Sequence, residues 1–195
     1  MISKPTEGEQ FELGVKYQPP GTSTLLTASL YHLVQSNSLT RDLTDSTGSF
    51  STQSGEETSQ GLELEAVSDL TNDLRMLASY SYNRAEVTES NDGDEGNTPI
   101  LTPEHLASLW LDYTLPSGML QGLGVSGGVR YSGSSYADAA NTSKNEAYTL
   151  VDLGAHYDLR GSLDGIRLAV NAKNSPTKSI CPVRGATAIG APAAR

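Results

Sequence analysis

Hydrophobic and polar residues alternate with a period of two along much of this chain. In the segment 10–18 the large hydrophobic residues all share one parity: Phe11, Leu13, Val15 and Tyr17. Polar residues and one glycine fill the positions between them. Because successive side chains of a β-strand point to opposite faces, this pattern predicts a strand with one apolar and one polar face.

The alternation recurs along the chain, and no segment shows a sustained helical stripe. It predicts an all-β protein, an antiparallel meander of about eight strands, near residues 9–18, 24–35, 58–68, 73–87, 104–115, 122–133, 147–158 and 165–174. The segment 24–35 is ambiguous, because Tyr31 and Leu33 fall on the face opposite to its other apolar residues.

The connections between the predicted strands alternate between short and long. The short ones span 19–22, 69–73, 116–119 and 160–164, and the long, polar ones span 36–57, 88–103 and 134–146. Tight turns at one end of a meander and long loops at the other are typical of a transmembrane β-barrel of the outer membrane. A soluble, acidic β-sandwich that acts as a binding module is the alternative, since sandwiches also have long loops.

Tyrosines on the apolar parity lie near the ends of the predicted strands. They are Tyr17, Tyr113 and Tyr157 beside short turns, and Tyr82 and Tyr131 near the opposite ends. Two such belts fit the two interfaces of a membrane, where an apolar ring with a polar tip is favoured. Core tyrosines whose hydroxyls reach water would give the same pattern.

The composition excludes several classes of function. The chain has 195 residues and a formal net charge of -10, whereas a nucleic-acid partner requires a basic surface. A single Cys excludes an internal disulfide framework and a Cys-rich zinc site. No apolar run approaches the ~18–20 residues of a membrane-spanning helix.

Short motifs do not indicate an enzyme or a cofactor. Residues 122–127 match G-x-G-x-x-G, but strand alternation continues after them where a dinucleotide site needs a helix. The acidic segment 91–97 lacks the ligand order of an EF-hand, which leaves a weak ion contact or a solvated loop tip. His32, His105 and His156 lack metal-ligand spacing, so no metal site is expected.

Six segments, in this order, resemble motifs of the TonB-dependent ferric-siderophore receptors of bacterial outer membranes, with the ferrichrome and hydroxamate-type group the nearest. They are GEQFELGVKY (8–17), GLELEA (61–66), PEHLASLWLDY (103–113), GGVRYSGSSY (127–136), YTLVD (148–152) and VNAKN (170–174). The resemblance implies a 22-stranded barrel closed by an N-terminal plug. This chain would be a C-terminal part of that barrel, without the plug and the closing strand.

The resemblance also implies a function. Such a receptor binds a ferric siderophore as its transported ligand and imports it without covalent chemistry, using energy that TonB delivers through the plug. Its other partner is the lipid of the outer membrane. The parent receptor would therefore reside in the outer membrane, whereas the location of this chain alone stays open.

The resemblance suggests three parts of the chain. Residues 1–7 would lead into the barrel, residues 8–174 would form part of its wall, and residues 175–195 depart from the family in a Pro/Ala/Gly-rich tail. Lone Cys181 cannot make the cysteine pair that the family has near this point. We hypothesise a reading-frame shift just after Asn174, and a non-functional truncated gene product is a further alternative.

Ligand contacts are expected in the barrel lumen and the outer loops. Tyr136 lies in a long loop, and Arg130 lies on the polar parity near the outer end of its strand, where a guanidinium could attract a chelate oxygen. Alternatively, Arg130 pairs with a carboxylate of the wall. The charges expected to face the lumen are Glu63, Glu65, Arg75 and Asp112. The two glutamates would pair with Arg75, Arg130 or Lys16.

Overall fold

A computed structural model describes residues 4–44, 47, 49–159 and 166–176, with the side chains of 174–176 excepted. Within these ranges the chain is all-β. Eight strands form one antiparallel sheet in the order β1-β2-β3-β4-β5-β6-β9-β10. They are β1 (Glu7–Tyr17), β2 (Leu25–Arg41), β3 (Ser51–Asp69), β4 (Leu74–Glu89), β5 (His105–Thr114), β6 (Leu123–Ser132), β9 (Tyr148–Asp158) and β10 (Arg167–Pro176). The described residues contain no helix with the length and apolar character needed to cross a membrane.

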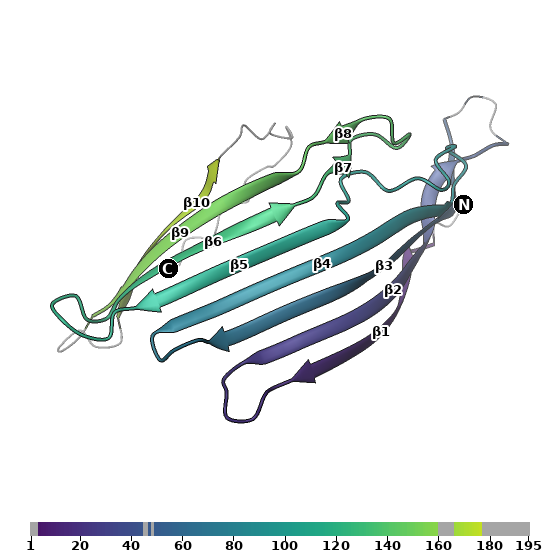
Figure 1. The fold of residues 1–195 in the computed structure, drawn as a ribbon. Helices are drawn as coiled ribbons and strands as arrows, with labels where there is room; N and C mark the ends of the chain where they lie inside the picture. The colour runs from purple at the N-terminus through teal and green to yellow at the C-terminus, as the bar shows by residue number, and fades with distance from the viewer. Residues whose placement is uncertain (1–3, 45–46, 48, 160–165, 177–195) are drawn as a thin grey trace, which may run out of the picture.

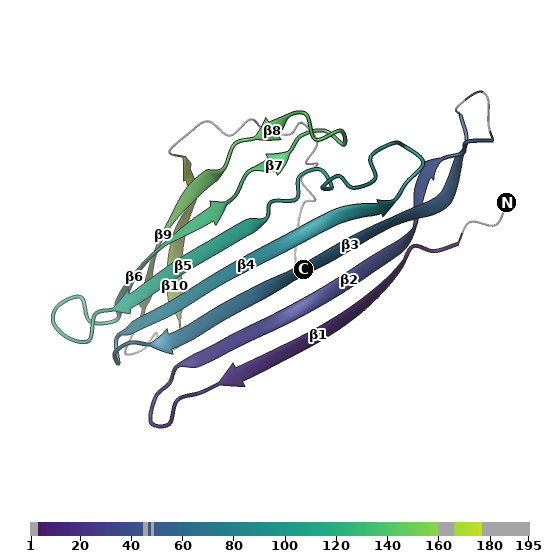
Figure 2. The same ribbon diagram turned by 45° about the vertical axis from the view of Figure 1, so that its right-hand side comes forward.

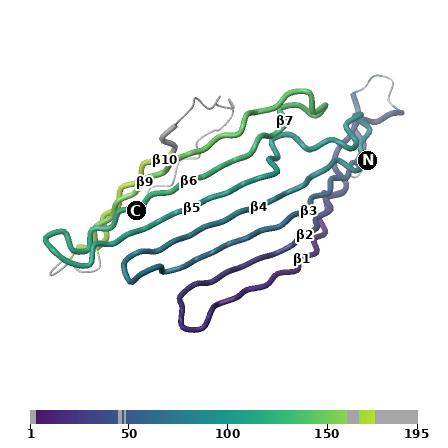
Figure 3. Tube along the Cα trace, in the orientation of Figure 1, coloured from purple at the N-terminus to yellow at the C-terminus, as the bar shows by residue number. Residues whose placement is uncertain are grey.

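The sheet is a tilted, curved wall in which strands adjacent in sequence lie side by side (Figure 1; Figure 2). The Cα trace shows β1 at one edge and β10 at the other (Figure 3). The short connections gather at one end of the wall and the long loops at the opposite end (Figure 1). The predicted meander, with its alternation of short and long connections, is therefore confirmed for the described residues.

The strand register separates the side chains into an apolar face and a polar face. One cross-strand row on the apolar face contains Tyr17, Leu26, Ala66, Ala78, Leu109, Val129 and Val151. The adjacent row on the polar face contains Lys16, Thr27, Glu65, Ser79, Ser108, Arg130 and Leu150. The ambiguity in β2 is resolved, because Tyr31 pairs with Gly61 on the polar face.

The apolar face has no covering layer in the described part of the chain. Phe11 is 68% exposed and Leu13 is 76% exposed, and no side chain of the described residues is fully buried. The buried hydrophobic residues are Ala85, Val87 and Leu150. A sandwich would bury such a face against a second sheet, so the soluble β-sandwich alternative receives no support.

Two predicted loop boundaries were wrong. The connection expected over 36–57 is mostly strand, since β2 continues to Arg41 and β3 begins at Ser51. A bulge between Ser36 and Leu39, with Asn37 at a φ of 62°, interrupts the pairing before it resumes. The connection expected over 134–146 contains a small hairpin of β7 (Ser135–Tyr136) and β8 (Lys144–Asn145). These segments are polar apart from Leu39 and the Tyr136 ring, so hydrophobic alternation could not reveal them.

The C-terminal boundary expected at residue 174 lies inside β10, which continues to Pro176. The register between β9 and β10 shifts between Ala172 and Ser175. The remainder of the predicted tail, including Cys181, lies outside the described residues. The hypothesis of a reading-frame shift therefore stays a prediction.

Aromatic rings lie over glycines of the neighbouring strand at three positions of the polar face. The cross-strand pairs are Tyr31 with Gly61, Trp110 with Gly128, and Gly124 with His156. A Cβ atom placed on any of these glycines would collide with the facing ring. The missing side chain therefore makes room for a ring that packs flat against the backbone and covers it.

We predict that Gly128→Ala weakens the sheet, because the new methyl group displaces the Trp110 ring and also meets the Leu109 carbonyl oxygen at 2.8 Å. The expected loss is about 1–3 kcal/mol in the free energy of unfolding, measured by denaturant unfolding with tryptophan fluorescence. Gly127→Ala is the matched control, since its Cβ would meet Leu153 at an ordinary 3.4 Å. Equal stability of the two variants would contradict the prediction.

Candidate functional site

A hollow of about 460 Å³ lies on the polar face where β2–β6 and β9 run side by side. Its lining is rich in hydroxyl groups, and Ser79 and Ser108 share a hydrogen bond of 2.8 Å across two strands. Glu63, Glu65 and Arg130 also line it. The hollow offers hydrogen-bonding groups and charges, but no nucleophile–base pair that would suggest covalent chemistry.

Arg130 is paired with Asp152 of the neighbouring strand. Its Nε donates to Oδ2 at 2.8 Å and its Nη2 donates to Oδ1 at 3.3 Å. The Asp152 side chain is 10% exposed, whereas that of Arg130 is 50% exposed. A forked contact of this kind fixes the orientation of the guanidinium. The structure thus shows the wall-carboxylate contact that was the alternative for Arg130, while half of the side chain still faces the hollow.

The other charges expected on this face lie on the polar parity, but their pairing differs from the expectation. Arg75 lies 3.8 Å from Asp69, and Arg130 pairs with Asp152. Neither arginine therefore has its ion pair with Glu63 or Glu65. Alternation placed the two glutamates on the polar face correctly. It could not show that carboxylates at the strand ends and on β9 lie closer to the arginines.

Asp112 belongs to a charged group near the short-turn end of the polar face. Its Oδ2 lies 3.8 Å from Nδ1 of His156, whose side chain is 13% exposed. On the next strand pair, Arg167 donates to Asp158 at 2.6 and 2.9 Å. The sequence analysis considered His156 only as a metal ligand and did not single out Asp158. Their partners become neighbours only through the register of β5, β6, β9 and β10.

Tyr136 lies in the hairpin of β7 and β8, at the long-loop end of the wall. The Lys144 Nζ lies 4.6 Å from the centroid of its ring, which is cation–π geometry. Both residues line a pocket of about 200 Å³, together with Glu104 and His105. Arg130 lines the larger hollow instead, so the structure places the two candidate ligand contacts in different cavities.

A second long loop holds the β7–β8 hairpin in place. Asn141 accepts a hydrogen bond from the Thr98 backbone N–H at 2.8 Å and donates one to the Thr98 carbonyl at 2.9 Å. Asn97 donates to the Ala139 carbonyl at 2.8 Å, and the Leu101 N–H donates to the Tyr136 carbonyl at 2.9 Å. The pocket around Tyr136 is therefore built by two loops that brace each other.

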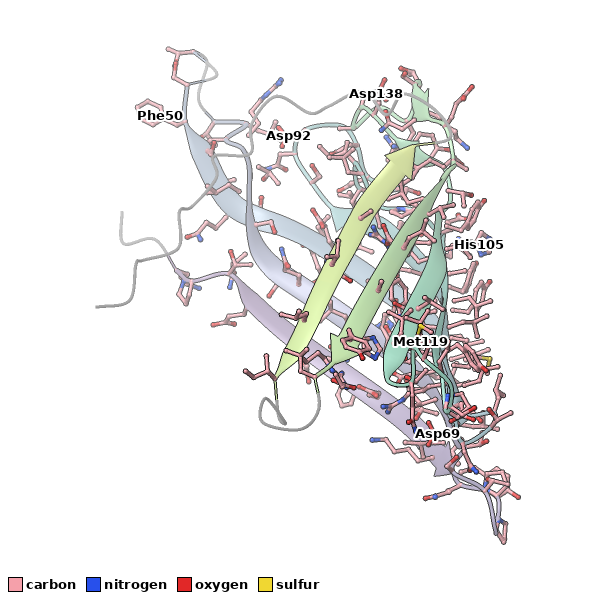
Figure 4. All side chains as sticks on the ribbon, turned by 90° about the vertical axis from the view of Figure 1, so that its left-hand side faces the viewer. Phe50, Asp69, Asp92, His105, Met119 and Asp138 are labelled. Atoms are coloured by element: carbon pink, nitrogen blue, oxygen red, sulfur yellow. The ribbon has the colours of Figure 1, made fainter. Side chains whose placement is uncertain are left out.

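Asp138 closes the turn between β7 and β8 (Figure 4). Its carboxylate accepts the Thr142 backbone N–H at 2.7 Å and the Thr142 hydroxyl at 2.6 Å. The hydrogen bond from the Thr142 side chain, followed by that from its backbone, lowers the pKa of Asp138 below the ordinary 3.8. Sequence reasoning did not single out this residue, although an Asp that accepts a later backbone N–H is a common turn former.

The acidic loop 91–97 is held by contacts within the protein. Asp92 Oδ1 accepts the Arg41 backbone N–H at 3.2 Å, and the Asn91 amide donates to the Arg41 carbonyl at 3.0 Å. No group of three or more His, Cys, Asp or Glu side chains in the described ranges is arranged to hold a metal ion. These contacts attach the loop to the end of β2.

We predict that acid loosens the β7–β8 turn. A carboxyl with a lowered pKa stabilises the folded loop fully above its ordinary pKa of 3.8, and the contribution is lost as pH falls through the lower folded-state pKa. Hydrogen exchange of the Thr142 amide, corrected for its intrinsic rate, should be slow at pH ~5 and become faster as the pH falls through the lowered pKa of Asp138. Asp138→Ala should exchange fast at both pH values, and a variant as protected as wild type at pH 5 would contradict the assignment.

Comparison with known proteins places this wall in a family. Residues 4–175 match the family described as TonB dependent receptor-like, beta-barrel. The ferrioxamine receptor of Yersinia enterocolitica is 39% identical over 180 residues, which cover 91% of this chain and 24% of the relative. The ferrichrome outer membrane transporter/phage receptor of Escherichia coli is 41% identical over 175 residues, covering 89% and 23%. The chain thus spans about a quarter of the length of these curated relatives.

Solved structures show the same architecture. BauA, the ferric preacinetobactin receptor from Acinetobacter baumannii, superimposes with a TM-score of 0.72 at 25% identity, over 87% of this chain and 25% of its own. The siderophore receptor PiuA from the same organism gives a TM-score of 0.69 at 27% identity, over 86% and 24%. The family match covers most of the chain and agrees with the open sheet and its apolar outer face, so this chain belongs to the TonB-dependent receptor family, as a piece of its β-barrel.

Proposed function

We propose that residues 8–174 form part of the wall of an outer-membrane receptor that imports a ferric siderophore with energy from TonB. The observation that carries this proposal is the uncovered apolar face, which extends from β1 to β10 opposite a continuous polar face. Lipid suits the first face and a polar barrel interior suits the second. The relatives named as ferrioxamine and ferrichrome receptors support the ligand class.

The orientation in the membrane follows from the connections. In outer-membrane barrels the short turns are periplasmic and the long loops are extracellular. Tyr17 and Tyr113 lie on the apolar face near the short turns, and Tyr82 and Tyr131 lie on it nearer the long loops. These positions suit the two interfacial belts. The pocket around Tyr136 would then open on the outside of the cell, where a siderophore arrives.

The edges of the sheet indicate that further strands are needed. An unpaired strand edge in hydrocarbon leaves backbone N–H and C=O groups without partners, at several kcal/mol each. In the described sheet β1 and β10 each have one paired neighbour. The proposed function therefore belongs to a complete barrel. TonB would act on that barrel through an N-terminal plug, and the receptor would catalyse no reaction.

Tyr136 is the stronger of the two candidate ligand contacts. Its ring and the Lys144 ammonium form one side of the outer pocket. An aromatic face and a cation together suit a hydroxamate-type chelate, which offers both apolar surface and oxygen atoms. Arg130 is a weaker candidate, because Asp152 already engages two of its nitrogen atoms.

A transport assay tests the proposal. A full-length receptor that carries residues 8–174 would be expressed in a strain without other hydroxamate receptors and supplied with radioactive iron as ferrioxamine or ferrichrome. We expect uptake that disappears when TonB is deleted. A receptor that reaches the outer membrane in folded form but takes up neither chelate would overturn the hydroxamate assignment.

Tyr136→Ala should weaken ligand capture and leave the barrel intact. Loss of an aromatic contact worth about 0.5–1.5 kcal/mol corresponds to a roughly two- to tenfold higher half-saturation concentration for uptake. Tyr157→Ala is the matched control, because Tyr157 lies on the apolar face beside a short turn, where it pairs with Leu123 and Leu168. Identical uptake curves for the Tyr136 variant and wild type would remove Tyr136 from the site.

A further inference from the structure

A trough of about 450 Å³ crosses the apolar face over β1–β4. Small side chains line its floor: Ala28, Ala66 and Ala78. The positions two residues away on the same strands carry the larger Leu26, Leu64 and Tyr80. The register brings the floor residues together, because Ala66 pairs with Ala78, and Ala28 pairs with Leu64. Larger apolar residues also line it: Val15, Tyr17, Leu26, Leu64 and Tyr80. Three residues of the polar parity complete the lining: Thr27, Glu65 and Ser79.

The end of the trough toward the short turns is polar. Thr24 and Ser68 lie two residues beyond Leu26 and Ala66, and their hydroxyls share a hydrogen bond of 2.7 Å. Ser68 is only 4% exposed, so this pair is built into the sheet. Beyond it, a hollow of about 700 Å³ lies between the turns 21–24 and 68–72. Further hydroxyl side chains line it, together with the Asp69 carboxylate, Leu70 and the Asn72 amide.

An apolar groove with a hydroxyl-rich polar hollow beyond one end has the polarity profile of one phospholipid. The trough is continuous with the apolar face, which meets hydrocarbon in the proposed orientation, and the polar hollow lies at the level of the periplasmic turns. A Tyr ring at each side of the floor, Tyr17 and Tyr80, would confine an acyl chain laterally.

We propose that the trough holds one acyl chain of a phospholipid of the periplasmic leaflet, with its headgroup at the hydroxyl-lined hollow. The proposal rests on the membrane orientation given above and is independent of which siderophore the receptor takes. It differs from ordinary solvation by lipid because the site is preformed and has both an apolar and a polar part. A lipid held in this way should stay bound through detergent extraction.

Native mass spectrometry of a full-length receptor that carries residues 8–174 tests the site. After extraction into mild detergent with added phosphatidylethanolamine, wild type should retain one more lipid than Ala66→Phe or Ala78→Phe, whose side chains fill the trough. Ala155→Phe is the matched control. Ala155 is an exposed alanine on the same face, paired with Val125, and it lies outside the trough. Equal lipid counts for folded wild type and both filled variants would overturn the proposal.

A second measurement uses wild type alone, so it does not depend on the folding of a variant. Phosphatidylethanolamine with a photoreactive acyl chain would be added at low ratio, and its adducts would be mapped by peptide mass spectrometry. Adducts should be several-fold more frequent on segments 15–28 and 64–80 than on segment 151–157. A uniform distribution over the apolar face would overturn the site. A receptor that fails to remain in the membrane would instead overturn the proposed orientation.

Discussion

The pairing register of the eight strands is the constraint on which every other feature depends. Because side chains alternate with a period of exactly two, a slip of one residue in one strand would turn its apolar residues toward the polar face. The register holds without interruption from Leu25 to Ser36 of β2 against β3. It also holds throughout the pairings of β5 with β4 and of β6 with β5 and β9. The Arg130–Asp152 contact and the three ring–glycine pairs exist only in that register.

The polar face determines the pairing register of the strands more precisely than the apolar face does. On the apolar side, aliphatic residues would meet lipid in the proposed barrel, and one Leu or Val could replace another with little change. On the polar side, Trp110 needs a glycine directly opposite, and Arg130 needs Asp152 at the distance of a forked hydrogen bond. Shape and hydrogen-bond geometry on this face therefore select one pairing, while the apolar face sets which side meets the membrane.

The sequence alone could predict the features that all the strands share, namely their positions and their two faces. It could not predict contacts that occur at only one place in the fold. Period-two alternation located the eight strands and their two faces, because each strand has one apolar and one polar face. It missed the ends of β2 and β3 beside the loop that joins them. Pairs there, such as Thr40 with Thr52, are held by backbone hydrogen bonds and do not require an apolar face. It also missed the bracing of Tyr136 by Asn141, since residues 98 and 141 meet only when two loops fold together.

The contrast between wall and loops has a functional consequence. The wall is a continuous ladder of paired strands, so backbone hydrogen bonds fix its shape. The outer loops are fixed differently, by side-chain contacts to backbone such as Asn141 with Thr98 and Asp138 with Thr142. Such contacts can change with a few substitutions without disturbing the register below them. A ligand pocket built there can therefore vary between receptors that share one wall, as expected when relatives at 39–41% identity are named for different siderophores.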